Sequence, residues 1–207
     1  MYRIKDTYTN TITIEKSVFI TRLFRVNSID DINKYLEEIR KKHYDATHNC
    51  YAYILGENQD IQKASDDGEP QKTAGYPMLD VLKKNNLTDI LAITTRYFGG
   101  ILLGANGLVR AYSNSVSEIV KKIELYQYES QTKFKIRVSY GDYNTLLKVF
   151  NYINYDETIF TNDVLITGYI KKELIQSFKE QLYKYKIDIE TLEILDDFNI
   201  EVKINEK

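Results

Sequence analysis

The hydrophobic periodicity of the chain runs through one series of strand and helix patterns and then begins a second series after residue 124. Each series mixes alternating apolar and polar residues, typical of half-buried strands, with apolar residues at helical spacing. At 207 residues the chain is long enough for two modest domains, each with its own core. We therefore predict an α+β protein with domains at 1–124 and 132–207, joined by a linker at 125–131.

The first series predicts a sheet covered by helices. "TITIEKSVFITRLFRV" alternates as a hairpin or a bent strand would, and Ser28 followed by Asp31 predicts the capped start of a helix. "DILAITTRY" is apolar enough to be a central strand, whereas residues 57–75 are polar and predict a long loop. The other predicted elements are a strand at 49–56, a short helix at 76–86 and a long helix ending near Ile123.

The second series has the element order of a known motif. "TKFKIRVSY" predicts a strand, "DYNTLLKVFNYI" a helix, and "TIFTNDVLITGYI" a strand pair or a bent strand. "KKELIQSFKEQLYKY" predicts a second helix, and the segment from residue 187 onward supplies one or two final strands. This β-α-β-β-α-β order is that of a ferredoxin-like domain.

Four of the nine glycines fall between a predicted strand and a predicted helix, in "TTRYFGGILLGANGLVRAY". They are Gly99, Gly100, Gly104 and Gly107, with Arg96 before them and Arg110 after them. A glycine turn at a helix start offers free N–H groups to an anion, and arginines add bidentate contacts. Close packing of helix on sheet explains the same glycines equally well. The spacing fits neither a Walker loop nor a dinucleotide-binding fingerprint.

A second candidate is the acidic segment "SDDGEPQKTAGYP". Asp66, Asp67 and Glu69 are close enough to surround a cation, with Gly68 and Pro70 shaping the turn. A solvated loop whose aspartates cap turns and helix starts is the commoner meaning of this pattern, and no calcium-loop register is present. We take these residues as ligand or partner contacts and predict no metal site.

A third candidate, "HYDATHNCYAY", contains His43, His48 and Cys50. Zinc sites need more ligands at characteristic spacings, and a nucleophilic cysteine must be exposed, whereas Cys50 opens an apolar strand. We therefore expect buried structural residues here, and we predict no catalytic residues and no cofactor.

Composition limits the classes of partner. The net charge is −2 and neither half of the chain is a basic block, so strong sequence-independent binding of nucleic acid is not supported. The single cysteine excludes an internal disulfide and favours a reducing compartment. No apolar run approaches the ~20 residues of a membrane span. We expect a cytoplasmic protein without membrane contact.

Three segments in this order resemble the N-terminal domain of the IMPACT family, which includes the bacterial YigZ-like proteins. They are "DATHNCYAYILG", "ASDDGEPQKTAGYPML" and "TTRYFGGILLGANGLVRAY". The resemblance implies a first domain of the ribosomal-protein βαβ type, as in domain IV of elongation factor G. It implies a ferredoxin-like second domain similar to domain V of that factor. Eukaryotic members of the family regulate translation.

The resemblance and the residues together indicate a non-catalytic regulatory protein linked to translation. We expect the loops at 65–75 and 96–110 to form one exposed surface that binds RNA, the ribosome or a translation-associated protein. In this interpretation Arg96 and Arg110 contact an anion. One alternative is a Mg²⁺-dependent enzyme acting on a phosphorylated small molecule. Another is that the motifs hold the first domain together, with Arg96 or Arg110 paired internally to the acidic loop.

Overall fold

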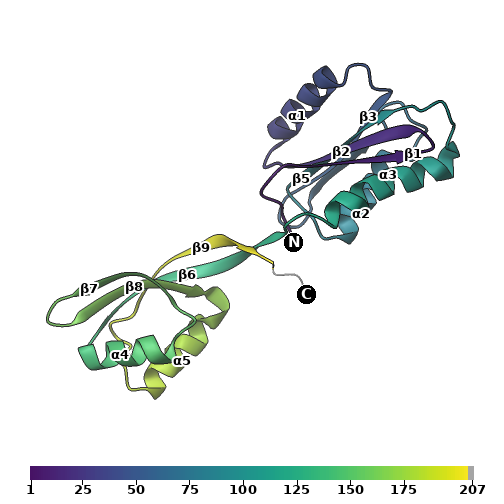
Figure 1. Cartoon of the computed structure of the whole chain (residues 1–207). Coiled ribbons are helices and arrows are strands. Elements are labelled where there is room, and N and C mark those ends of the chain that lie inside the picture. The colour runs from purple at the N-terminus through teal and green to yellow at the C-terminus, as the bar shows by residue number, and fades with distance from the viewer. Residues whose placement is uncertain (205–207) are drawn as a thin grey trace. The chain divides into compact units, whose positions relative to one another are not determined.

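The computed structural model describes residues 1–204 and divides them into two compact units (Figure 1). The first unit comprises residues 1–127 and 203–204, and the second comprises residues 128–202. Both units combine helices with an antiparallel sheet, which confirms the predicted α+β class.

The first unit has five strands and three helices among its described residues. They are β1 (Tyr8–Ile14), β2 (Ser17–Arg25), α1 (Ile29–Lys42), β3 (His48–Leu55), β4 (Ile61–Ser65), α2 (Gly75–Lys84), β5 (Ile90–Tyr97) and α3 (Gly104–Val120). The strands form one sheet in the order β1-β2-β5-β3-β4. β5 therefore occupies the centre, as its apolar sequence predicted.

Alternate residues of the central strands pack into two different cores. Cys50, Ala52 and Ile54 of β3 belong to the core beneath α2 and α3. Tyr51 and Tyr53 belong to the core beneath α1. The sheet is thus covered on both faces, which explains why β3 and β5 are nearly continuous apolar runs.

Two predicted local features are confirmed. β1 and β2 form a hairpin whose turn residues, Glu15 and Lys16, both have positive φ, as the favoured two-residue hairpin turn requires. Ser28 accepts a hydrogen bond from the backbone N–H of Asp31, whose side chain accepts one from the backbone of Ser28. This capping box starts α1 where the sequence placed it.

The loop predicted at 57–75 is partly wrong, because Ile61–Ser65 form the edge strand β4. All side chains of β4 are exposed or half buried, so the strand lacks the apolar alternation that would have revealed it. Residues 66–74 of the segment do remain a loop.

The second unit follows the predicted β-α-β-β-α-β order. Its elements are β6 (Tyr126–Val138), α4 (Tyr140–Val149), β7 (Asn154–Phe160), β8 (Val164–Lys171), α5 (Ile175–Lys184) and β9 (Glu193–Lys203). The sheet order is β7-β8-β6-β9, and the core packs β6 and β8 against both helices. Phe134, Phe150 and Phe178 are the largest side chains buried in it.

The stretch 125–131, expected to be a linker, lies mostly within β6. At its start, the carbonyl of Leu125 accepts a 2.8 Å hydrogen bond from the backbone N–H of Ile204. Within residues 1–204, no helix has the length and apolar character needed to cross a membrane.

Candidate functional site

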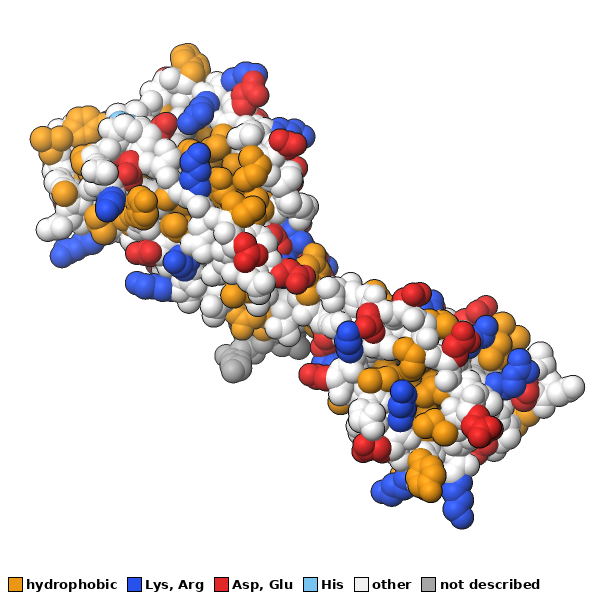
Figure 2. Space-filling model, turned by 180° about the vertical axis from the view of Figure 1, so that it is seen from behind, with side chains coloured by type: hydrophobic (Ala, Val, Ile, Leu, Met, Phe, Trp, Pro, Cys, Tyr) orange, Lys and Arg blue, Asp and Glu red, His pale blue; other side chains and the backbone are white. Residues whose placement is uncertain are grey.

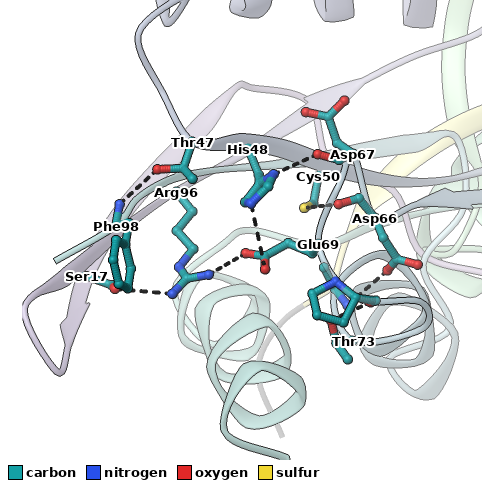
Figure 3. Close-up of polar contacts among 12 residues, drawn as sticks. Ser17, Thr47, His48, Cys50, Asp66, Asp67, Glu69, Thr73, Arg96 and Phe98 are labelled. Carbon is teal, nitrogen blue, oxygen red and sulfur yellow. Dashed lines mark hydrogen bonds and ion pairs between the residues drawn. The ribbon is translucent and has the colours of Figure 1, made fainter. Parts of the chain in front are cut away.

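A row of three side chains across the first unit's sheet positions the candidate site. Arg96 on β5 pairs in register with Phe19 on β2 and with His48 on β3. The loop between β4 and α2 folds over this row and brings Glu69 to Arg96 (Figure 3). The acidic loop and the start of the glycine-rich segment are therefore in contact.

Arg96 and Glu69 form a buried ion pair. Nη1 of Arg96 donates to Oε1 of Glu69 at 2.6 Å, and the two side chains are 6% and 3% exposed. Nη2 lies 3.4 Å from Oγ of Ser17, and the guanidinium lies 5.5 Å from the ring centres of both Phe19 and Phe98. Nε is buried and makes no hydrogen bond within the described chain. Arg96 thus follows the internal-pairing alternative and does not present an exposed guanidinium to an anion.

Asp66 holds the start of α2. Its Oδ1 accepts hydrogen bonds from the backbone N–H groups of Ala74 and Gly75 at 3.0 and 2.9 Å, and its Oδ2 accepts one from Lys72 at 2.7 Å. The N-cap residue of α2 is Ala74, whose side chain offers no acceptor. Asp66 therefore supplies from outside the helix the acceptors that a capping side chain normally provides.

Asp67 and Gly68 form the tight turn of the acidic loop. Both have positive φ, 45° and 89°, as expected of an Asp-Gly pair in this type of turn. Oδ2 of Asp67 accepts from the backbone N–H of Asn49 at 2.7 Å, and Oδ1 lies 3.5 Å from Nη2 of Arg40. The carboxylate thus ties the turn to β3 and to α1.

The three carboxylates of the loop therefore serve three different partners. Asp66 binds backbone, Asp67 binds backbone and an arginine, and Glu69 binds Arg96. Across residues 1–204, no group of three or more His, Cys, Asp or Glu side chains is arranged to hold a metal ion.

Cys50 and Tyr112 lie beneath the acidic loop. The Sγ of Cys50 lies 3.0 Å from the carbonyl oxygen of Asp66 and 3.3 Å from the hydroxyl of Tyr112, which donates to Oε1 of Glu69 at 2.8 Å. Burial raises the pKa of the Cys50 thiol and the pKa of the Tyr112 phenol. Cys50 is fully buried and protonated, as expected of a structural cysteine and not of a nucleophile.

The clustered glycines serve different purposes. A side chain at Gly99 would overlap the backbone of Lys16 and Ser17 in the β1–β2 turn, so close packing requires glycine there. Gly100 and Gly104 have open space around them but positive φ, at 86° and 69°. These two are needed for the turn that leads into α3.

A pocket of about 360 Å³ opens beside the ion pair, between the acidic loop and the N-terminal end of α3. Its surface is mainly apolar, and it is lined by Thr47, His48, Gly68, Glu69, Pro70, Arg96, Phe98, Leu102, Leu103, Gly104, Ala105 and Leu108. Leu102 is 88% exposed and Phe98 is 45% exposed. We call this feature the His48–Glu69 pocket.

The pocket unites only part of the predicted site. Gly68, Glu69, Arg96 and Gly104 line it, whereas Asp66, Asp67, Gly99, Gly100 and Arg110 do not. Arg110 is exposed on α3, away from the buried face that carries Leu108 and Tyr112.

Sequence reasoning missed the apolar part of the pocket. The signal was present in "FGGILLG", where Phe98, Ile101 and Leu102 are large apolar residues inside a glycine turn. All three side chains are exposed, and Phe98 and Leu102 line the pocket.

Comparisons with known proteins bear on the same part of the chain. The family model described as Impact N-terminal domain matches residues 15–120, which include every residue of the pocket. The IMPACT family member YvyE of Bacillus subtilis is 40% identical over 201 residues, covering 93% of this chain and 91% of the relative. The IMPACT family member YigZ of Escherichia coli is 38% identical over 129 residues, covering 61% of this chain and 63% of the relative.

One solved structure is similar over nearly the whole length. It is described as a crystal structure of an hypothetical protein, and it superposes with a TM-score of 0.60 at 27% identity. The match covers 94% of this chain and 95% of that chain. The similarity therefore extends through both units.

Proposed function

The chain belongs to the IMPACT family, and we propose that it is a non-catalytic regulatory protein of translation that binds a protein partner through the His48–Glu69 pocket. The link to translation rests on what membership in this family implies. The choice of surface rests on the pocket and on the apolar residues around it.

The observation that carries the proposal is an apolar patch at the mouth of the pocket. Phe98 and Leu102 line the pocket, and both are exposed, as is Ile101 on the same turn between β5 and α3. Exposed apolar side chains beside a pocket are typical of protein–protein contacts, in which a few well-buried side chains provide most of the affinity. Gly100 and Gly104 fix the turn that presents these side chains.

Charge favours a protein partner over RNA. Affinity for RNA depends on cations that contact phosphates, and Arg96, the arginine nearest the pocket, is already neutralised by Glu69. The face shown in Figure 2 carries acidic and basic side chains interspersed on both units, without a continuous basic surface. The net charge of −2 agrees with this distribution.

The alternative of a Mg²⁺-dependent enzyme depends on carboxylates that converge on the metal. Asp66 directs both oxygens to backbone N–H groups, and Oε1 of Glu69 accepts from both Arg96 and Tyr112. The arrangement supports a rigid binding loop better than a phosphate-transfer site, so we retain the binding function as our proposal.

Affinity capture from a translating cell extract tests this function. We expect the immobilised full-length chain to retain a ribosomal protein or a translation factor after nuclease treatment. Leu102→Ser should reduce the captured amount at least tenfold, because it removes an exposed apolar side chain from the pocket's edge. Leu147→Ser is the matched control, since Leu147 is an exposed leucine on α4 of the second unit.

Two outcomes contradict the proposal. If Leu102→Ser captures as much as the unmodified chain, the pocket is not the binding surface. If nuclease treatment releases everything that was bound, the partner is RNA.

A further inference from the structure

We propose that the His48–Glu69 pocket takes a tryptophan side chain of the partner, with the indole N–H donated to the two acceptors inside the pocket. This inference rests on the proposed function and specifies the chemistry of its binding surface.

The first acceptor is Nε2 of His48. Nδ1 of the same ring lies 2.8 Å from the carbonyl oxygen of Asp67, and a carbonyl oxygen only accepts. Nδ1 must therefore carry a hydrogen, which leaves Nε2 of the neutral ring with a free lone pair. The Asp67–Gly68 turn thus fixes the tautomer of His48.

The second acceptor is Oε2 of Glu69. Its partner oxygen, Oε1, already accepts from Arg96 and from Tyr112, whereas no hydrogen bond to Oε2 is formed within the described chain. The side chain is 3% exposed and lines the pocket, so Oε2 is the oxygen of this carboxylate that remains able to accept from a ligand.

The two acceptors are close to each other but cannot satisfy each other. Nε2 of His48 and Oε2 of Glu69 are 3.8 Å apart, a contact drawn in Figure 3 that becomes an ion pair only when the ring is protonated. With the ring neutral, neither atom carries a hydrogen, and the distance is beyond that of a hydrogen bond. A donor placed between them would meet two lone pairs at once.

The charges around these acceptors favour a neutral donor. An anion would face both lone pairs, and the only buried donor of Arg96 without a partner, Nε, is sealed from the pocket. A cation would face Arg96, which already balances the charge of Glu69. Two ligands alone are too few for a metal site. A neutral N–H or O–H group remains.

The apolar walls of the pocket favour an aromatic side chain as the group that bears this N–H or O–H donor. Phe98, Leu102, Leu103 and Leu108 supply apolar surface, and a ring against Phe98 gains from aromatic contact. Indole N–H is purely a donor, whereas the phenol of tyrosine would also bring lone pairs toward the acceptors. Tryptophan is also enriched among the residues that anchor protein interfaces.

Titration of the full-length ¹⁵N-labelled chain with small probes tests this inference. We expect indole to shift the backbone amide signals of Leu102–Leu108. We expect 1-methylindole, which has the same shape but no donor, to bind at least tenfold more weakly. Inorganic phosphate should leave these signals unchanged.

Two variants distinguish the loss of the His48 acceptor from a loss of folding. His48→Asn keeps a donor near Asp67 but removes Nε2, whereas His48→Gln places a polar atom near the position of Nε2. Indole affinity should fall at least fivefold in His48→Asn and be partly retained in His48→Gln. Thermal denaturation of each variant verifies that it is folded.

Equal binding of indole and 1-methylindole, absence of indole binding, or binding of phosphate at the same amides would each overturn the inference. These results are independent of the partner capture described above. Indole selectivity together with unchanged capture by Leu102→Ser would refute the proposed function and leave the ligand chemistry of the pocket intact.

Discussion

Glu69 is the residue on which the geometry of the pocket depends. It joins the acidic loop to β5 through Arg96 and to α3 through Tyr112. A charge buried to this degree is tolerated only because its counter-charge and hydrogen-bond donors are buried with it.

Removal of this charge should destabilise the first unit strongly. Glu69→Gln leaves Arg96 buried without a counterion, so the free energy of unfolding should fall by about 3–5 kcal/mol. Urea denaturation followed by circular dichroism measures the change. Arg137→Ala is the control, because its ion pair with Asp163 lies at the surface and should contribute much less than the buried pair. Equal effects of the two substitutions would show that the buried pair has no special role.

His43 should make stability depend on pH. Nη2 of Arg22 lies 2.6 Å from Nε2 of His43, so that nitrogen must accept, and the ring must be neutral. Burial and then the charge of Arg22 hold the pKa of His43 below its usual value of about 6.5. The unfolded chain therefore binds more protons, and the stability present above about pH 6.5 should decrease as the pH falls toward the lowered pKa.

His43→Gln provides the comparison for this pH effect. It removes the titrating ring, so the free energy of unfolding should vary less with pH below about 6.5 than in the unmodified chain. Identical pH profiles of the two proteins, or an NMR titration that places the pKa of His43 above 6.5, would contradict the prediction.

At the scale of elements, the start of α2 is held by a residue outside the helix. Asp66→Ala removes the acceptor of three backbone N–H groups and should lower the free energy of unfolding by about 2 kcal/mol or more. Asp80→Ala on the exposed side of the same helix is the control and should change it by less than about 0.5 kcal/mol. Thermal melting compares the stability of the two variants, and similar losses of stability would refute the capping role of Asp66.

Elements with strong periodicity or caps could be predicted from the sequence. α1 begins at the capping box of Ser28, and the buried face of α3 carries the predicted apolar residues, including Leu108 and Tyr112. β4 could not be predicted from hydrophobic periodicity, because none of its side chains is fully buried. The strand forms through its backbone pairing with β3 at the edge of the sheet.

The candidate site was predictable in its segments but not in its contacts. The acidic loop and the glycine turn were both identified, yet the pairing of Glu69 with Arg96 depends on the sheet register and on the turn at Gly68. The sequence alone does not show which charged side chain a loop will bury. For the same reason, the distinct functions of Asp66 and Glu69, three positions apart, became visible only in three dimensions.

At the scale of the whole molecule, the two units have separate cores. The cores of the first unit draw on residues between Tyr2 and Leu125, and the core of the second on residues between Phe134 and Leu192. A fragment of residues 1–127 should therefore fold without the second unit. Dispersed ¹H–¹⁵N amide signals and cooperative thermal unfolding of the fragment would verify this, and collapsed signals would show that the units depend on each other.

The chain enters the second unit along β6 and leaves it along β9, and these strands are neighbours in one sheet. Hydrolysis of a peptide bond in β9 would leave the two units covalently joined through β6. Hydrolysis in β6 would leave the released piece attached to the first unit only by non-covalent contacts, such as the hydrogen bond from Ile204 to Leu125. A nick in β6 would therefore allow the two units to part, whereas a nick in β9 would keep them on one polypeptide.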